Sequence, residues 1–254
     1  MLRTRVAIAF IASLALMGAC SSESSSTTTV ETTAVTTLPD TTLPDTTVPT
    51  TAPATTDATT VPETTVPAEM QPAIWPAADV VFTTPEAAAT DFLANVFGEG
   101  PVIGEFMAGD SRSGEFEVFA TESGTPVGEA RSVLFMRQLG PENAWFVLAA
   151  GSDVATIATP ESMAVVPAAP LTVNGLGTGF EATIILHAFV AGDTTSEFDR
   201  EVTMAGNFGE SLPYSVELDL SAAIIGDIVV VMITGGTGLE TDPGDFSAIP
   251  VVIG

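Results

Sequence analysis

Residues 21–69 contain no aromatic side chain and consist mainly of Thr, Pro, Ser, Val and acids. A five-residue near-repeat runs through them as TTLPD, TTLPD, TTVPT, TTVPE and TTVPA. Such a segment buries too little apolar surface to offset the cost of ordering its backbone, about 1–2 kcal/mol per residue. The sequence therefore predicts a disordered Thr/Pro/Ser-rich linker over residues 20–73, and it confines any folded core to the residues that follow.

Regularly spaced proline favours extended backbone in this linker. At about 3.1 Å per residue, it would reach on the order of 150 Å. We interpret it as a stalk that holds the folded part away from an anchoring surface. Thr and Ser beside Pro are typical of O-glycosylated stalks, and an unmodified spacer fits the same composition.

The N-terminal residues have the pattern of a secretory signal. Arg3 and Arg5 precede an apolar run over 6–17, and small residues lead to Cys20. The run is shorter than the roughly 20 residues that a membrane-spanning helix needs. The segment LMGAC resembles the lipobox of bacterial lipoproteins, which implies a signal peptide over 1–19, lipidation of Cys20 and an extracytoplasmic protein anchored to the cell membrane. Cys20 is the only cysteine, so no internal disulfide is possible.

The region 74–160 has an α+β pattern. Thr84, Pro85 and Glu86 predict the start of a helix, and Gly98 predicts its end. Strands are expected near 104–107, 115–119, 132–139, 144–150 and 154–158, with a hairpin turn at 140–143. One helix on an antiparallel sheet resembles the cystatin-like and nuclear-transport-factor-like folds in topology. We predict a small α+β domain here.

The region 161–254 is expected to contain strands and turns alone. Residues 215–220 alternate apolar and polar side chains, as in a strand with one wet face, whereas 228–233 is apolar throughout, as in a strand covered on both sides. Further strands are predicted at 163–166, 171–174, 180–190, 201–204 and 249–253. Seven short strands favour an all-β sandwich, with no cysteine pair of the antibody type.

Four runs in this region carry a family resemblance: PLTVNGLGTGFEATIIL, LPYSVELDL, GDIVVVMITGGTGL and FSAIPVVI. Their order resembles the immunoglobulin-like domain of bacterial spore germination proteins. Matching features include Phe180 and Glu181 at the opening of a long strand and Tyr214 after a proline. The resemblance implies an immunoglobulin-like interaction module and brings no catalytic residues with it.

The inventory of reactive side chains argues against an enzyme. The chain has one histidine, His187, no lysine and no second cysteine. Cys-His chemistry and His-rich metal sites are therefore excluded, and no G-x-S-x-G motif accompanies His187. We interpret His187 as a strand residue that faces solvent or a neighbour. A pair of acids of the glycosidase type stays open, because 32 acids are present.

Two other groups of charged residues are candidates for binding. Asp242 and Asp245 flank Pro243 and Gly244, a pattern that fits either calcium ligands or an ordinary turn. The arginines of the first region would either converge on an anionic ligand or pair with local carboxylates. These are Arg112, Arg131 and Arg137. No catalytic, cofactor or metal residue is assigned.

The formal net charge is −26, which disfavours nucleic acid and anionic lipid as partners. The sequence as a whole predicts a non-enzymatic, lipid-anchored surface protein. Its immunoglobulin-like module would bind an envelope protein or cell-wall glycan, in spore germination or in the cell envelope. The alternatives are a carboxylate-dependent hydrolase acting on cell wall or carbohydrate, and a purely structural spacer.

Overall fold

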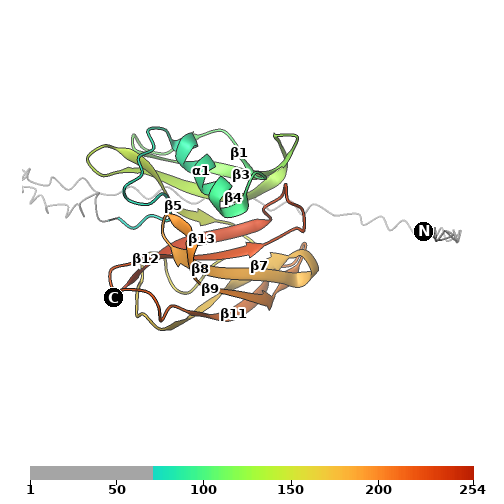
Figure 1. The fold of residues 1–254 in the computed structure, drawn as a ribbon. Helices are drawn as coiled ribbons and strands as arrows, with labels where there is room; N and C mark the ends of the chain where they lie inside the picture. The colour runs from blue at the N-terminus through green and yellow to red at the C-terminus, as the bar shows by residue number, and fades with distance from the viewer. Residues whose placement is uncertain (1–70) are drawn as a thin grey trace, which may run out of the picture. The chain divides into compact units, whose positions relative to one another are not determined.

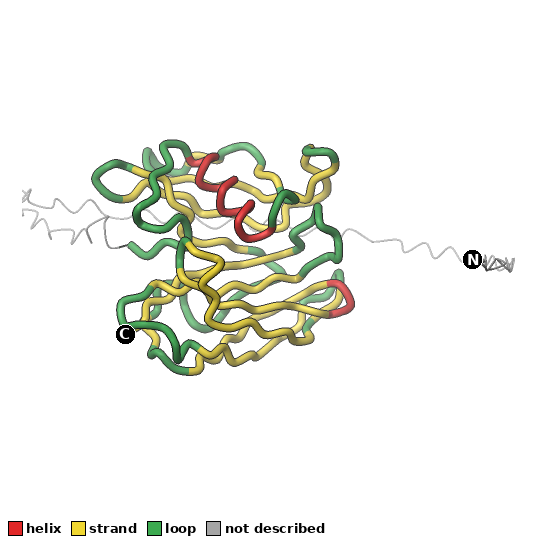
Figure 2. Tube along the Cα trace, in the orientation of Figure 1, coloured by secondary structure: helices red, strands yellow, loops and turns green. Residues whose placement is uncertain are grey.

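The computed structural model describes residues 71–254, so the expectations for the signal peptide, Cys20 and most of the linker lie outside the described residues. The described part consists mainly of antiparallel strands with one α-helix (Figures 1 and 2). The elements are α1 (Pro85–Phe97), β1 (Val102–Ile103), β2 (Met107–Ala108), β3 (Ser113–Glu122), β4 (Thr125–Leu139), β5 (Ala144–Gly151), β6 (Val165–Val166), β7 (Pro170–Gly179), the 3₁₀ turn η2 (Phe180–Ala182), β8 (Thr183–Val190), β9 (Asp193–Met204), β10 (Gly206–Asn207), β11 (Leu212–Asp219), β12 (Ile228–Gly235) and β13 (Asp245–Ile253).

Helix α1 begins and ends where its capping residues predict. The Thr84 hydroxyl accepts a hydrogen bond from the Ala87 N–H at 3.3 Å, and Pro85 occupies the first helical position, where no N–H is needed. At the other end, Gly98 adopts a φ of +78° and donates its N–H to the Ala94 carbonyl. The helix buries one face, formed by Ala88, Ala89, Phe92 and Leu93.

The strands form two sheets. The larger follows the order β1-β3-β4-β5-β13-β12-β8-β9, with β2 beside β3 and β6 beside β13; the smaller follows β10-β7-β11. All pairings are antiparallel except β6 with β13 and β10 with β7. The larger sheet therefore continues from the α1 half of the protein into the C-terminal half, where β7 and β11 lie against it (Figure 1).

Strand β12 is covered on both faces, which explains its continuous apolar run. Val230 and Met232 point into one core, which they share with α1 and strands β3 to β5. Val229, Val231 and Ile233 point into a second core, between the larger sheet and strands β7 and β11. Successive strand residues face opposite sides, so a strand between two cores must be apolar at every position. The prediction for residues 228–233 is confirmed.

Three strand predictions are wrong in whole or in part. Residues 104–106 join β1 to β2, so only Met107 of the strand expected near 104–107 lies in a strand. Residues 154–158 form a loop rather than a strand, although Thr156 and Ala158 donate backbone hydrogen bonds to carbonyls of β7. The single strand expected over 180–190 is interrupted at its start, because Glu181 and Ala182 have φ values of +53° and +61°. Extended backbone needs negative φ, so β8 begins only at Thr183.

The predicted boundary between the two domains, at residues 160 and 161, lies in the loop between β5 and β6. The described residues belong to one compact unit. Strand β13 pairs with β5 across that boundary, at Ala248 and Ala150. Residues from both sides of the boundary also share the core under α1. Independent folding of the two regions stays a prediction.

Candidate binding site at the loop end of the sandwich

The turn η2 joins β7 to β8 with an uncommon backbone. Two consecutive residues other than glycine, Glu181 and Ala182, lie in the left-handed region. Each such residue costs on the order of 1 kcal/mol or more and persists only where its surroundings hold it. Here the Phe180 N–H donates to the Gly236 carbonyl at 3.0 Å, and the Ala205 N–H donates to the Ala182 carbonyl at 2.8 Å. Hydrogen bonds with the segment that follows β12 and with the residue that follows β9 thus hold the turn.

This strained turn presents an aromatic side chain to solvent. Phe180 is 48% exposed, and Phe208, which follows β10, is 50% exposed. Their rings lie 6.2 Å apart between centroids and are tilted by 45°. An aromatic pair of this kind stabilises a fold best when it is buried, so a half-exposed pair marks a surface that another molecule can cover. We call Phe180 and Phe208 the aromatic pair.

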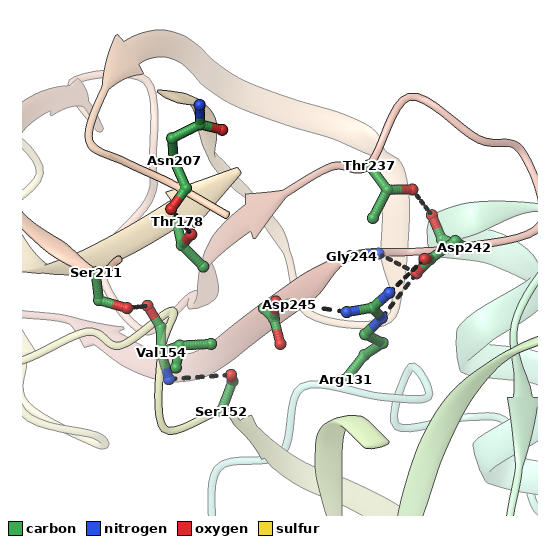
Figure 3. Close-up of polar contacts among 10 residues, drawn as sticks. All are labelled: Arg131, Ser152, Val154, Thr178, Asn207, Ser211, Thr237, Asp242, Gly244 and Asp245. Carbon is green, nitrogen blue, oxygen red and sulfur yellow. Dashed lines mark hydrogen bonds and ion pairs between the residues drawn. The ribbon is translucent and has the colours of Figure 1, made fainter. Parts of the chain in front are cut away.

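Close backbone contacts fix the segments that carry the aromatic pair. A Cβ atom at Gly235 would lie 1.7 Å from the Thr178 carbonyl oxygen, so only glycine fits where β12 ends. The Thr178 hydroxyl donates to the Asn207 carbonyl at 3.0 Å (Figure 3). The Asn207 side-chain oxygen accepts from the Phe208 N–H. The position of Phe208 is therefore set by contacts on β7 and β10.

The neighbouring loop, residues 236–244, is tied to strand β4 by an arginine. The Arg131 Nε donates to Asp242 Oδ1 at 3.0 Å and its Nη2 donates to Asp242 Oδ2 at 2.6 Å, while Nη1 lies 4.0 Å from Asp245 Oδ2 (Figure 3). The Asp242 Oδ1 also accepts the Gly244 N–H, as in an ordinary Asp turn. Bidentate pairing of this kind restricts geometry as well as adding energy.

Arg131 occupies the position that a cation would take between the two carboxylates. Burial raises the pKa of Asp245, Arg131 opposes that rise, and the Asp242 charge adds to it. Within residues 71–254, no group of three or more His, Cys, Asp or Glu side chains is placed to hold a metal ion. The contacts of Asp242 with Gly244 and Arg131 are those of the plain-turn interpretation, and calcium binding at Asp242 and Asp245 stays an untested hypothesis.

The three arginines do not converge on one point. Arg112 donates from Nη2 to the Gln138 carbonyl at 3.2 Å, and Arg137 pairs with Ser113 in register, so both lie where β3 begins and β4 ends. Arg131 lies six residues earlier on β4, about 20 Å away in an extended strand. It pairs with Asp242, as the alternative of local carboxylate pairing predicts, whereas Arg112 and Arg137 form no ion pair within residues 71–254.

His187 lies on β8 with its Nδ1 3.6 Å from Glu197 Oε2, and Glu197 is also hydrogen-bonded to Arg200. Burial, with the Arg200 charge, lowers the pKa of His187 to about 4, although Glu197 opposes the shift. The imidazole is therefore neutral near pH 7, and its contact with Glu197 is not an ion pair there. The structure places His187 beside a neighbouring side chain, as the sequence interpretation states.

No protein-family model, curated protein or solved structure matches this chain. The site is therefore defined by its own geometry. None of the helices among residues 71–254 is long and apolar enough to cross a membrane.

No sequence pattern predicts the aromatic pair as a site. The composition of residues 180–190 places Phe180 in a strand, and Phe208 belongs to no predicted element. The available signal is the glycines near each phenylalanine, three before Phe180 in GLGTGF and one on each side of Phe208 in GNFG, because glycine marks turns and close backbone approach. Such a signal indicates a loop, but it does not show that two loops bring their aromatic rings together.

Proposed function

We propose that this protein is a lipid-anchored surface protein whose C-terminal half is an immunoglobulin-like binding module. The observation that carries the proposal is the aromatic pair, which the strained turn at Glu181 and Ala182 holds half-exposed. Backbone strain at a surface turn is typical of binding and catalytic loops. Loops at one end of a β-sandwich are a common place for recognition, because the sheets hold them rigidly.

Two further features support a binding role. The loop 236–244, next to the turn, is held by the Arg131–Asp242 pair and by a hydrogen bond from the Thr121 N–H to the Thr241 carbonyl. A surface held in advance loses less entropy on binding. The resemblance to the immunoglobulin-like domain of spore germination proteins also implies an interaction module. The partner would be an envelope protein or a cell-wall glycan.

Attachment through Cys20 and display on the Thr/Pro-rich stalk complete the proposal. They rest on the sequence pattern, since Cys20 and all but the last three residues of the linker lie outside residues 71–254. Display of this kind would let the aromatic pair meet partners at a distance from the membrane. It suits an adhesion or assembly role better than chemistry in solution.

The test is proximity labelling on intact cells with the full chain as bait. We expect a reproducible set of labelled envelope components, which the double variant Phe180→Ser, Phe208→Ser should lose. The double variant Ile224→Ser, Ile225→Ser is the matched control, because both side chains are exposed and apolar and precede β12, whereas the turn of Phe180 contacts Gly236 beyond the other end of that strand. If the variant of the aromatic pair labels the same components as the wild type and the control, the aromatic pair is not the binding surface.

A further inference from the structure

A cleft of about 610 Å³ lies at the opposite end of β8 and β12 from the aromatic pair. Three parts of the chain enclose it: the segment 71–81, the turn between β4 and β5, and the residues where β8 ends and β12 begins. Its volume falls within the range of about 300–1,000 Å³ that is typical of small-molecule sites. No sequence pattern indicates this cleft, because its walls come from segments far apart in the chain.

Small side chains leave this cleft open. Its lining includes Ala78, Ala144, Ala191 and Gly140, where larger side chains would fill the space. Most of the remaining wall is formed by the apolar side chains of proline, valine, leucine and isoleucine residues and of Phe146. Its polar members are Gln71, Glu142 and Asp227.

Two of the lining valines face solvent. Val80 is 40% exposed and Val81 is 50% exposed. Covering these side chains with an apolar molecule would release water from them, which favours binding. The cleft is thus suited to an apolar body rather than to a sugar or a phosphate.

The charged side chains that line the cleft are all acidic. Glu142 and Asp227 line it, and Asp79 lies between the lining residues Ala78 and Val80. None of the arginines in residues 71–254 belongs to its lining. Asp227 already accepts the Ile224 N–H at 2.8 Å, whereas Glu142 is exposed on the hairpin turn. An anionic ligand would be repelled here, and a cation would be attracted.

We propose that this cleft binds a small organic cation, an ammonium or guanidinium group carried on an apolar body. The apolar part lies against Val80, Val81 and Phe146. The cationic group lies toward Glu142 and Asp227. This site is separate from the aromatic pair, and the proposal does not depend on the proposed function.

The experiment is a calorimetric titration of the full chain with two probes of similar shape and opposite charge, 1-naphthylmethylammonium and 1-naphthylacetate. We expect saturable binding of the cation and much weaker binding of the anion. Added sodium chloride should weaken binding of the cation, since salt screens partly exposed charges. Equal binding of the two probes, or no saturable binding of the cation, would overturn the proposal.

Variants locate the binding within the molecule. Glu142→Gln should weaken binding of the cation about threefold, the effect of one exposed charge pair, and Glu142→Arg should reduce or reverse the preference for the cation. Ala78→Trp should block the cleft, because Ala78 is exposed at its wall. If Ala78→Trp keeps its thermal midpoint and still binds the cation, the cleft is not the site. The charge variants decide the matter if Ala78→Trp does not fold.

Two controls guard against binding elsewhere. Glu217→Gln removes a carboxylate from an exposed position on β11, in the smaller sheet, and should leave the titration unchanged. The double variant Phe180→Ser, Phe208→Ser should also bind the cation as the wild type does. A loss of binding in that double variant would assign the probe to the aromatic pair and would contradict the cleft proposal.

Discussion

Arg131 and Asp242 lie 111 residues apart in the chain, and their side chains meet through two hydrogen bonds of 3.0 and 2.6 Å. The Asp242 side chain is 9% exposed and that of Arg131 is 29% exposed, so water screens the pair only in part. Through this contact, strand β4 fixes the loop that lies beside the turn carrying Phe180. The pair thus couples the α1 half of the protein to the proposed binding surface.

We predict that Asp242→Asn lowers the free energy of unfolding by about 2 kcal/mol, because Arg131 loses a bidentate partner and stays partly buried. Asp245→Asn is the matched control. Burial raises the pKa of Asp245, so its ionised form is disfavoured in the folded protein, and removing that charge should leave stability unchanged or slightly higher near neutral pH. Urea denaturation measures both variants. Equal losses of unfolding free energy in the two variants would show that the bidentate pair with Asp242 contributes no more to stability than the Asp245 carboxylate does.

The protein should lose stability as the pH falls from 6.5 toward 4, because His187 has its pKa lowered to about 4 in the folded state and an ordinary value of 6.5 when unfolded. The unfolded chain then binds a proton that the folded chain does not. The contribution of His187 to the free energy of unfolding is fully present above pH 6.5, and about 2 kcal/mol of it is lost by pH 5.

His187→Gln tests this contribution, since glutamine does not titrate. The comparison is the pH slope of the free energy of unfolding above pH 5, where most carboxylates stay ionised. We expect the variant to show a shallower slope than the wild type. Identical slopes would mean that His187 titrates normally in the folded protein. Binding at the aromatic pair should be unaffected in either case.

Met232→Ala should destabilise the protein by about 3 kcal/mol, because Met232 is fully buried in the core shared by α1 and the C-terminal strands. Met204→Ala is the control, since Met204 on β9 is 65% exposed and should tolerate truncation. Thermal and urea unfolding should each show one transition for the wild type and for Met232→Ala. Two separate transitions would indicate that the halves unfold independently.

The fragment 161–254 tests the two-domain prediction directly. Without the α1 half, it would expose Phe189, Val230, Met232 and Phe246 to water, all of which lie in the shared core. We therefore expect the isolated fragment to associate or to unfold at lower urea than the full chain. A monomeric fragment with an all-β circular dichroism spectrum and cooperative unfolding would support two independent domains.

Cys20→Ala should move the protein from the membrane fraction to the medium, because lipidated Cys20 is the proposed attachment to the membrane. Ser21→Ala, which changes the next residue and leaves the cysteine, is the control and should remain membrane-bound. Cell fractionation with detergent phase partitioning measures the outcome. Retention of Cys20→Ala in the membrane fraction would contradict the lipoprotein hypothesis.

Features that depend on neighbouring residues could be predicted from the sequence alone. The bounds of α1 follow from Thr84, Pro85 and Gly98, whose effects act within one helical turn. The turn at 140–143 and the two-sided burial of 228–233 follow from composition and periodicity in the same way. These signals are local, so they need no knowledge of what lies across the fold.

Only the tertiary structure decided which distant residues meet. The sequence around Asp242 and Asp245 fits calcium ligands as well as a turn, and only the structure shows that Arg131 lies between them. Phe180 fits a strand by propensity, yet hydrogen bonds from distant segments hold the next two residues in left-handed backbone. The pairing of these charged side chains and the backbone conformation of this turn depend on long-range contacts. The energies of such contacts exceed the small local preferences from which a sequence pattern predicts structure.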